Sequence, residues 1–252
     1  MTPLVAETLR WAYRGQQEAL RGAAALVQHL GRRFAFDEVP LVTPAQVQAL
    51  RESFVELLRR DYANAAAGIY PASLLFQMPL RTYVRALPRL ARDLPNVLRR
   101  KQHDHWKDLP ADVDLHEYPP YYRRTFHWQS DGYLSRRSAE LYDVGVEFLF
   151  GGTADVMRRQ ILPPIVAHAR GRGYGHGGER LRVLEIACGT GRAGEQVLRA
   201  LPDASYTGVD LSPFYVDVAR EQLAARGREV SLVVANAEAL PLPDASFDVV
   251  FS

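Results

Sequence analysis

Glycines and acidic residues in the last third of the chain are spaced as a nucleotide-binding site requires. Gly189 and Gly191 follow the apolar residues Val183, Leu184, Ile186 and Ala187, a pattern typical of a buried parallel strand. Glycine lets the backbone turn sharply and approach a ligand closely. The helix expected over residues 192–201 would then begin at the carboxyl edge of a sheet, where its N–H groups bind nucleotides.

The positions of two carboxylates indicate which class of nucleotide this site would bind. Glu185 lies within the first expected strand, where it would repel a pyrophosphate but suits a ligand that carries an ammonium and a sulfonium group. Asp210 ends the next expected strand, over residues 205–210, and can accept hydrogen bonds from two ribose hydroxyls. The spacing of Gly189, Gly191 and Gly194 also matches the dinucleotide fingerprint. A nicotinamide-dependent oxidoreductase is therefore an alternative.

Four motifs, in the order and spacing found in that family, resemble class I S-adenosylmethionine-dependent methyltransferases. The resemblance is greatest to the subgroup of ubiquinone and menaquinone biosynthesis methyltransferases. They are Glu185-x-Ala-Cys-Gly-Thr-Gly-Arg192, Gly208-Val-Asp210-Leu-Ser212, Asn236-Ala-Glu-Ala-Leu-Pro241 and Phe247-Asp-Val-Val250. The resemblance covers residues 135–252. It implies an α/β fold with a Rossmann-like, doubly wound parallel sheet, and S-adenosyl-L-methionine as the cofactor. Glu185 and residues 236–241 favour this family over the oxidoreductase.

The resemblance also implies which residues bind the cofactor. Residues 185–191 would hold its methionine part and Asp210 its ribose, while Asn236 and Ala237 would lie beside the adenine. The family usually has aspartate at the position of Asn236, but an amide oxygen can still accept a hydrogen bond from the adenine amino group. The predicted cofactor-binding residues are Glu185, Ala187, Gly189, Thr190, Gly191, Arg192, Asp210, Leu211, Asn236, Ala237 and Glu238.

Residues 118–133 are dense in aromatic and hydrogen-bonding side chains. We expect them to close over the cofactor, with Gly132 as a hinge, and to line the pocket of a small, apolar or lipid-like acceptor. The alternative is that these aromatic residues attach the helical region to the sheet. His127 is the candidate general base, because its ordinary pKa lies near neutrality; an ordinary hydrogen-bonded histidine is the alternative. The catalytic group is otherwise unknown.

Composition limits the other partners. The net charge of +2 gives no preference for nucleic acid. A single cysteine, Cys188, excludes an internal disulfide and a multi-cysteine metal site. The histidines and aspartates of residues 103–116 match no standard ligand spacing, so no metal is expected. No apolar run reaches membrane-span length and no signal-peptide pattern is present, which predicts a cytoplasmic protein.

The region upstream of the glycines is expected to be helical. Helices should begin at Pro3 and, after the cap residue Thr43, at Pro44. Residues 71–100 should form short, kinked helices whose arginines, at positions 81, 85, 89 and 92, suit peripheral contact with anionic lipid or simply a solvated face. A helix over 135–150 should be followed by one from Thr153 to Pro164, and then by a flexible connector over 170–178.

Three regions are therefore predicted. Residues 1–117 form a helical N-terminal region, 118–178 a lid with helices and a glycine-rich connector, and 179–252 a partial cofactor-binding domain. The sequence stops inside the expected fourth strand, which would leave an apolar sheet edge uncovered. We therefore expect the sheet to be incomplete at its C-terminus. A non-catalytic binding or interaction module is the second alternative function.

Overall fold

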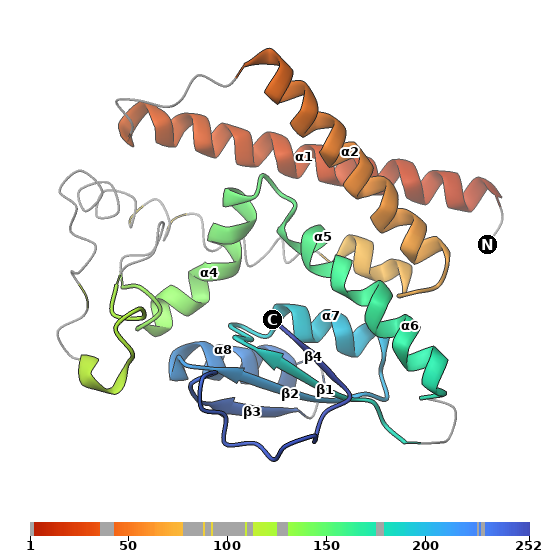
Figure 1. Ribbon diagram of the computed structural model, residues 1–252. Coiled ribbons are helices and arrows are strands. Elements are labelled where there is room, and N and C mark those ends of the chain that lie inside the picture. Colours follow the sequence, from red (N-terminus) through yellow and green to blue (C-terminus); the bar gives the residue numbers. More distant parts are fainter. Residues whose placement is uncertain are drawn as a thin grey trace. The chain divides into compact units, whose positions relative to one another are not determined.

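The computed structural model describes residues 3–35, 43–77, 88, 92, 109, 113–124, 131–174, 179–225, 227 and 230–252 (Figure 1). Contacts divide the chain into two compact units. One consists of Met1–Met78 and Val146–His168, and the other of Pro79–Gly145 and Ala169–Ser252. The three regions predicted from the sequence, with limits at 117/118 and 178/179, stay a prediction.

The first unit is helical. Its main elements are α1 (Pro3–Ala35), α2 (Pro44–Ala66), η1 (Ala72–Phe76), α5 (Ala154–Arg158) and η3 (Arg159–Ile161). The predicted start of a helix at Pro44 is confirmed, because the Thr43 side chain accepts the Gln46 backbone N–H and the Gln46 side chain accepts the Thr43 N–H. This reciprocal capping satisfies donors that a helix N-terminus would otherwise leave unpaired.

A buried ion pair lies at the centre of this helical unit. Asp61 is 0% exposed and Arg159 1% exposed, and Arg159 Nη2 lies 2.7 Å from Asp61 Oδ2. The hydroxyls of Tyr13 and Tyr70 also donate to the Asp61 carboxylate, the latter at 2.6 Å. Arg159 donates further to the Leu74 carbonyl at 3.2 Å. Buried charges are tolerated only when they are paired and hydrogen-bonded in this way.

Two predictions about the middle of the chain were wrong. The helix α4 (Arg136–Leu149) agrees with the expected range, but α6 (Leu162–Arg172) runs through Pro163 and Pro164 instead of ending there. Proline is accepted in a first helical turn because the N–H it lacks would have no partner within the helix. The predicted connector over 170–178 is accordingly helical up to residue 172, and residues 175–178 lie outside the described part.

The second unit contains a parallel sheet. Its elements are β1 (Arg182–Ile186), α7 (Arg192–Ala200), β2 (Ser205–Asp210), α8 (Pro213–Ala224), β3 (Ser231–Val234) and β4 (Val249–Phe251), together with the short η2 (Leu115–Glu117). The strand order is β3-β2-β1-β4, with every pairing parallel (Figure 1). The chain thus reverses its winding direction between β1 and β4. The prediction of a Rossmann-like α/β fold is confirmed.

Strand register brings the predicted site residues to one edge of the sheet. Ile186 at the end of β1 pairs with Val209, and Asp210 at the end of β2 pairs with Val234. Ser212, which precedes Pro213, caps α8 by accepting the Tyr215 N–H. The carboxyl ends of β1 and β2 therefore meet where the glycine turn begins.

Gly194 allows α7 to lie directly on β2. A Cβ atom at this position would lie 2.3 Å from the ring of Tyr206, closer than non-bonded atoms can approach. The third glycine of the fingerprint therefore serves close packing between helix and strand.

Asp248 fastens β4 to β1. Its carboxylate accepts the Arg182 backbone N–H at 2.8 Å and the guanidinium at 2.9 Å. These bonds to Arg182 lower the pKa of Asp248 to about 2. β4 is an edge strand of the sheet, and its Val250 is 56% exposed. Whether further chain covers this edge stays a prediction.

Much of the predicted helical stretch over 71–100, with most of its arginine stripe, lies outside the described residues. Among the helices that the structure does describe, none combines the length and the apolar composition needed to cross a membrane.

Candidate functional site

The chain makes a tight left-handed turn after β1. Ala187, Gly189 and Gly191 have φ angles of 57°, 54° and 76°. The Cys188 N–H donates to the Val209 carbonyl at 2.9 Å, which holds the turn against the end of β2. Glycine adopts this backbone region without strain, whereas Ala187 is one of only two described non-glycine residues that do so. The turn leads directly into α7, whose N-cap is Gly191.

Asp210 is joined to this turn by a direct hydrogen bond. Its Oδ2 accepts the Gly189 N–H at 2.8 Å, and its Oδ1 accepts the Ser212 N–H at 2.9 Å. Burial raises the pKa of Asp210, and the backbone N–H groups of Ser212, Gly189 and Leu211 oppose that rise. A carboxylate has about four acceptor positions, so these backbone bonds leave acceptor capacity for a ligand.

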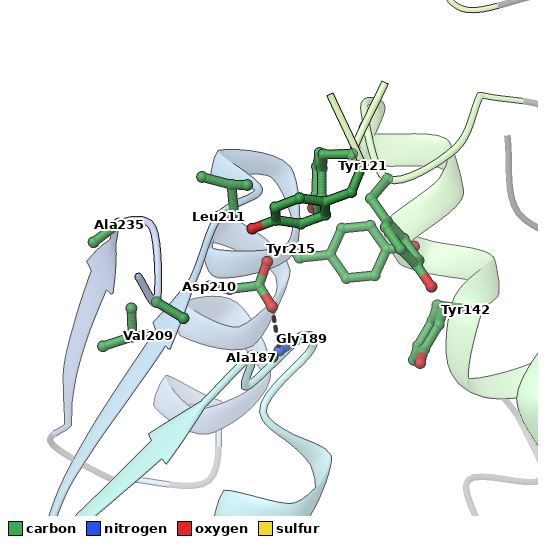
Figure 2. A pocket seen from close by; sticks show the side chains of 12 residues that line it. Tyr121, Tyr142, Ala187, Gly189, Val209, Asp210, Leu211, Tyr215 and Ala235 are labelled. Carbon is green, nitrogen blue, oxygen red and sulfur yellow. Dashed lines mark hydrogen bonds between the residues drawn. The ribbon is translucent and has the colours of Figure 1, made fainter. Parts of the chain in front are cut away.

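A cavity of about 220 Å³ opens beside Asp210 (Figure 2). Turn and strand residues form part of it, and tyrosines form the rest. The lining residues are Tyr121, Tyr122, Tyr133, Tyr142, Ala187, Gly189, Val209, Asp210, Leu211, Tyr215, Ala235 and Ala237. All of them belong to the second unit.

Five of the residues predicted from the sequence line this cavity together: Ala187, Gly189, Asp210, Leu211 and Ala237. They come from three separate strand ends, and only the fold brings them together. Figure 2 shows the Asp210 carboxylate directed at the Gly189 amide. The cavity is thus centred on the turn and the acid that the sequence singles out.

Glu185 does not line the cavity. It is 4% exposed and its carboxylate accepts a short hydrogen bond from the hydroxyl of Tyr206. Tyr206 in turn lies against Gly194 of α7. The Glu185 carboxylate is therefore held beneath the glycine turn, and its predicted contact with the ammonium of the cofactor stays a prediction.

Three other predicted residues of the turn also lie outside the cavity lining. Thr190 donates to Asp143 of α4 at 2.8 Å. Arg192 forms a buried ion pair with Glu195 at 3.2 Å, and Gly191 caps α7. These residues shape the turn, and their contact with a ligand stays a prediction.

Asn236 and Glu238 form a small turn after β3. The Asn236 side-chain oxygen accepts the Glu238 N–H at 3.0 Å, and the amide nitrogen donates to the Glu238 carboxylate at 3.3 Å. An amide oxygen has two acceptor positions, so Asn236 can still accept the predicted hydrogen bond from adenine. Neither residue lines the cavity, whereas Ala235 and Ala237 on either side of Asn236 do.

Aromatic residues form the remaining wall. Tyr121, Tyr122 and Tyr133 come from the segment that the sequence predicts as the lid, and they do line the cavity. Sequence reasoning missed Tyr142 of α4 and Tyr215 of α8. Tyr215 follows Asp210 by little more than one helical turn, a spacing that could have suggested its position.

The wall is held by polar bonds as well as ring contacts. The Ser212 hydroxyl donates to the Tyr133 carbonyl at 2.6 Å, and the Ser138 hydroxyl lies 3.2 Å from that of Tyr215. Gly132, the predicted hinge, has φ 58°, and a Cβ there would lie 2.6 Å from the Arg124 carbonyl. Glycine is thus required at position 132 for a close backbone approach, and its role as a hinge stays a prediction.

The catalytic group is not identified by this geometry. His127 lies outside the described residues, so its role as a base stays a prediction. Across the described ranges, no group of three or more histidine, cysteine, aspartate or glutamate side chains is placed to hold a metal ion. Cys188 is a free, buried thiol whose pKa is raised by burial, which disfavours the reactive thiolate.

Comparison with known proteins gives matches over the same part of the chain. Residues 183–252 match the family model described as a methyltransferase domain. Demethylmenaquinone methyltransferase of Thermus thermophilus is 41% identical over 69 residues, which are 27% of this chain and 31% of that protein. Phthiotriol/phenolphthiotriol dimycocerosates methyltransferase of Mycobacterium leprae is 41% identical over 71 residues, 28% of this chain and 26% of that protein. The chain thus spans about a third or less of the curated relatives it matches.

A solved structure also aligns with this chain. The S-adenosylmethionine-dependent methyltransferase SibL in its apo form aligns over 96% of this chain and 67% of its own, with 19% identity and a TM-score of 0.30. The residues matched by the methyltransferase-domain model include all four motifs that the sequence analysis identifies, from Glu185 to Val250. Residues 183–252 are therefore similar to methyltransferase domains.

Proposed function

We propose that this protein transfers the methyl group of S-adenosyl-L-methionine to a small, apolar or lipid-like acceptor. The observation that carries the proposal is the Asp210 carboxylate, held at 2.8 Å from the Gly189 amide inside a largely apolar cavity. A carboxylate that retains acceptor capacity suits the two hydroxyls of a ribose. The family match of residues 183–252 supports the same cofactor.

The residues present fit the adenosyl part of this cofactor. Asp210 would hold the ribose, and the small side chains of Ala235 and Ala237 leave room for a flat base beside β3. The turn at Gly189 lets the backbone approach the ligand, because no Cβ intervenes. We assign the methionine part to the turn over residues 185–191, as the motif implies.

When bound, S-adenosylmethionine supplies a methyl group on a sulfonium whose departure leaves a neutral thioether. The chain therefore has three tasks: to orient the cofactor, to exclude water and to present the acceptor in line with the methyl group. Asp210 and the turn after β1 would orient the cofactor. The tyrosines of the cavity wall would exclude water. For an acceptor that must lose a proton, we retain His127 as the candidate base.

The nature of the lining supports the class of acceptor. Of the twelve described residues that line the cavity, only Asp210 is charged, and most of the others present carbon surface. Two relatives of residues 183–252 are named for demethylmenaquinone and for phthiotriol dimycocerosates. Peripheral contact with a membrane and a cytoplasmic location belong to this proposal.

Calorimetry with three ligands tests the proposal. We expect binding of S-adenosylmethionine and of S-adenosylhomocysteine, and none of a nicotinamide dinucleotide. Binding of the dinucleotide alone would identify an oxidoreductase, and binding of none would identify a non-catalytic module. Transfer of radiolabelled methyl groups to quinol and lipid-alcohol acceptors, measured in the full-length protein, tests the acceptor class separately.

A further inference from the structure

Three tyrosine rings gather on the glycine-turn side of the cavity. Tyr133, Tyr142 and Tyr215 form a tyrosine cluster, with ring centroids 5.4 Å apart for Tyr133–Tyr215 and for Tyr142–Tyr215. The third pair, Tyr133–Tyr142, is separated by 6.1 Å. All three pairs have edge-to-face geometry. A Cβ built on Gly189 would lie 3.9 Å from the Tyr215 ring, so the cluster adjoins the turn.

The charge of the cavity is negative. Asp210 is the one carboxylic acid among the described lining residues, and none of these described residues is an arginine, a lysine or a histidine. Burial raises the pKa of Tyr133 to about 12 and that of Tyr122 further still, so these phenols are neutral at pH 7. The faces of neutral aromatic rings carry negative electrostatic potential. The carboxylate and the rings together therefore favour a cationic ligand over a neutral one of the same shape.

We propose that the tyrosine cluster recognises the positive charge of the sulfonium group, so that the cavity distinguishes the charged methyl donor from its neutral thioether product. This inference rests on the proposed function. A cation within about 6 Å of a ring centroid is attracted by the ring quadrupole, and the attraction grows when water is excluded. The thioether that remains after methyl transfer has lost that attraction. The same rings would thus favour binding of the donor and release of the product.

The test compares the dissociation constants of S-adenosylmethionine and S-adenosylhomocysteine in the wild type and in variants of Tyr142. Tyr142 is suitable because it is only partly buried, whereas Tyr215 is 2% exposed in a small core with Ala139 and Val218. In Tyr142→Leu we expect the ratio of the dissociation constant of the product to that of the donor to fall by about 2- to 30-fold. This is the range that loss of a cation–π contact would give. Tyr142→Phe retains the ring and should keep the preference within about twofold.

Two further variants make the result specific. Tyr121→Leu alters a lining residue whose ring contact is with Tyr122, outside the cluster, and should weaken both ligands by the same factor. Should Tyr142→Leu fail to fold, phenylalanines that carry increasing numbers of fluorine atoms can replace Tyr142. They keep the shape of the ring, while each fluorine makes the electrostatic potential of its face less negative. The preference for the donor should then fall with each added fluorine.

The outcomes separate this inference from the proposed function. If the wild type binds both ligands and Tyr142→Leu weakens them equally, the cluster is an apolar surface and the inference is overturned while the function stands. If the fluorinated series leaves the ratio unchanged, the inference is likewise wrong. Binding of neither ligand by the wild type overturns both.

Discussion

The Oδ2 atom of Asp210 accepts the backbone N–H of Gly189 at 2.8 Å. This bond joins the end of β2 to the turn after β1, across 21 positions of sequence. It fixes the carboxylate at the entrance of the turn, while the Ser212 N–H holds the other oxygen at 2.9 Å. The acid is therefore oriented before any ligand arrives, which reduces the ordering that binding requires.

The affinity for S-adenosylhomocysteine should depend on the protonation of Asp210. Burial raises the pKa of this carboxyl, so protonation begins at a higher pH than for an ordinary aspartate. Above the raised pKa the carboxylate accepts ribose hydroxyls and affinity is full; below it one oxygen carries a proton and affinity falls. Calorimetry between about pH 4 and pH 8 measures this. In Asp210→Asn the affinity should be weak and flat over the same range. If the affinity of the wild type for S-adenosylhomocysteine were equally independent of pH, the result would contradict the assignment.

Gly194→Ala should destabilise the sheet unit. The added methyl would meet the Tyr206 ring at 2.3 Å, and overpacking of this kind costs about 1–3 kcal/mol. Gly145→Ala is the matched control, because a Cβ there has nothing within 4 Å; alanine in a helix should stabilise by up to about 1 kcal/mol. Thermal unfolding of the two variants measures both effects. Equal stability of the two would show that α7 does not lie on β2 as described.

Asp61→Asn should strongly destabilise the helical unit. Arg159 is 1% exposed, and loss of its carboxylate partner would leave a buried charge uncompensated. This should lower the free energy of unfolding by about 3–5 kcal/mol. Denaturant unfolding followed by circular dichroism measures the change. Glu56→Gln removes the exposed partner of Arg59 and should change little, because exposed ion pairs contribute little.

Removal of both charges tests the same ion pair from the other side. Asp61→Leu combined with Arg159→Met and Tyr13→Phe removes both charges and the buried hydroxyl that donates to Asp61, and should be less destabilising than Asp61→Asn combined with Tyr13→Phe. The Tyr70 hydroxyl keeps the Asp61 backbone carbonyl as an acceptor at 2.8 Å. A charge-free variant that is less stable than Asp61→Asn with Tyr13→Phe would indicate that the ion pair itself supplies net stability.

Residues 118–124 and 131–133 should gain protection from hydrogen exchange when S-adenosylhomocysteine binds. The cavity of about 220 Å³ is smaller than the roughly 300–1,000 Å³ usual for ligand sites, so we expect the tyrosine wall to shift when a whole nucleoside ligand enters. Once the ligand is bound, the wall would close over it. Protection confined to residues 183–240 would show that these aromatic residues only attach neighbouring elements to the sheet.

The sheet and its turn could be predicted because their signals are local. The apolar residues before Gly189 and the acid at position 210 are signals that act within a few residues, and the structure confirms the two strands that they predict. The helix that passes Pro163 was mispredicted because a proline at the first turn and one at the end of a helix look alike in sequence.

The rest depends on contacts between residues far apart in sequence. Glu185 is bound by Tyr206, 21 positions away, which no spacing rule indicates. Arg159 reaches Asp61 across 98 positions, and each alone resembles a solvated helical charge. Tyr142 joins the cavity wall only because α4 lies near the glycine turn, where Asp143 accepts a bond from Thr190.

The central claim is that Asp210 and the glycine turn bind S-adenosylmethionine, and calorimetry of Asp210→Ala tests it most directly. Loss of two charge-assisted hydrogen bonds to the ribose should cost about 2–4 kcal/mol. That corresponds to roughly 30- to 1,000-fold weaker binding of S-adenosylhomocysteine. Asp203→Ala, an exposed acid in the same unit, should leave the affinity unchanged. A folded Asp210→Ala protein with the dissociation constant of the wild type would contradict the account.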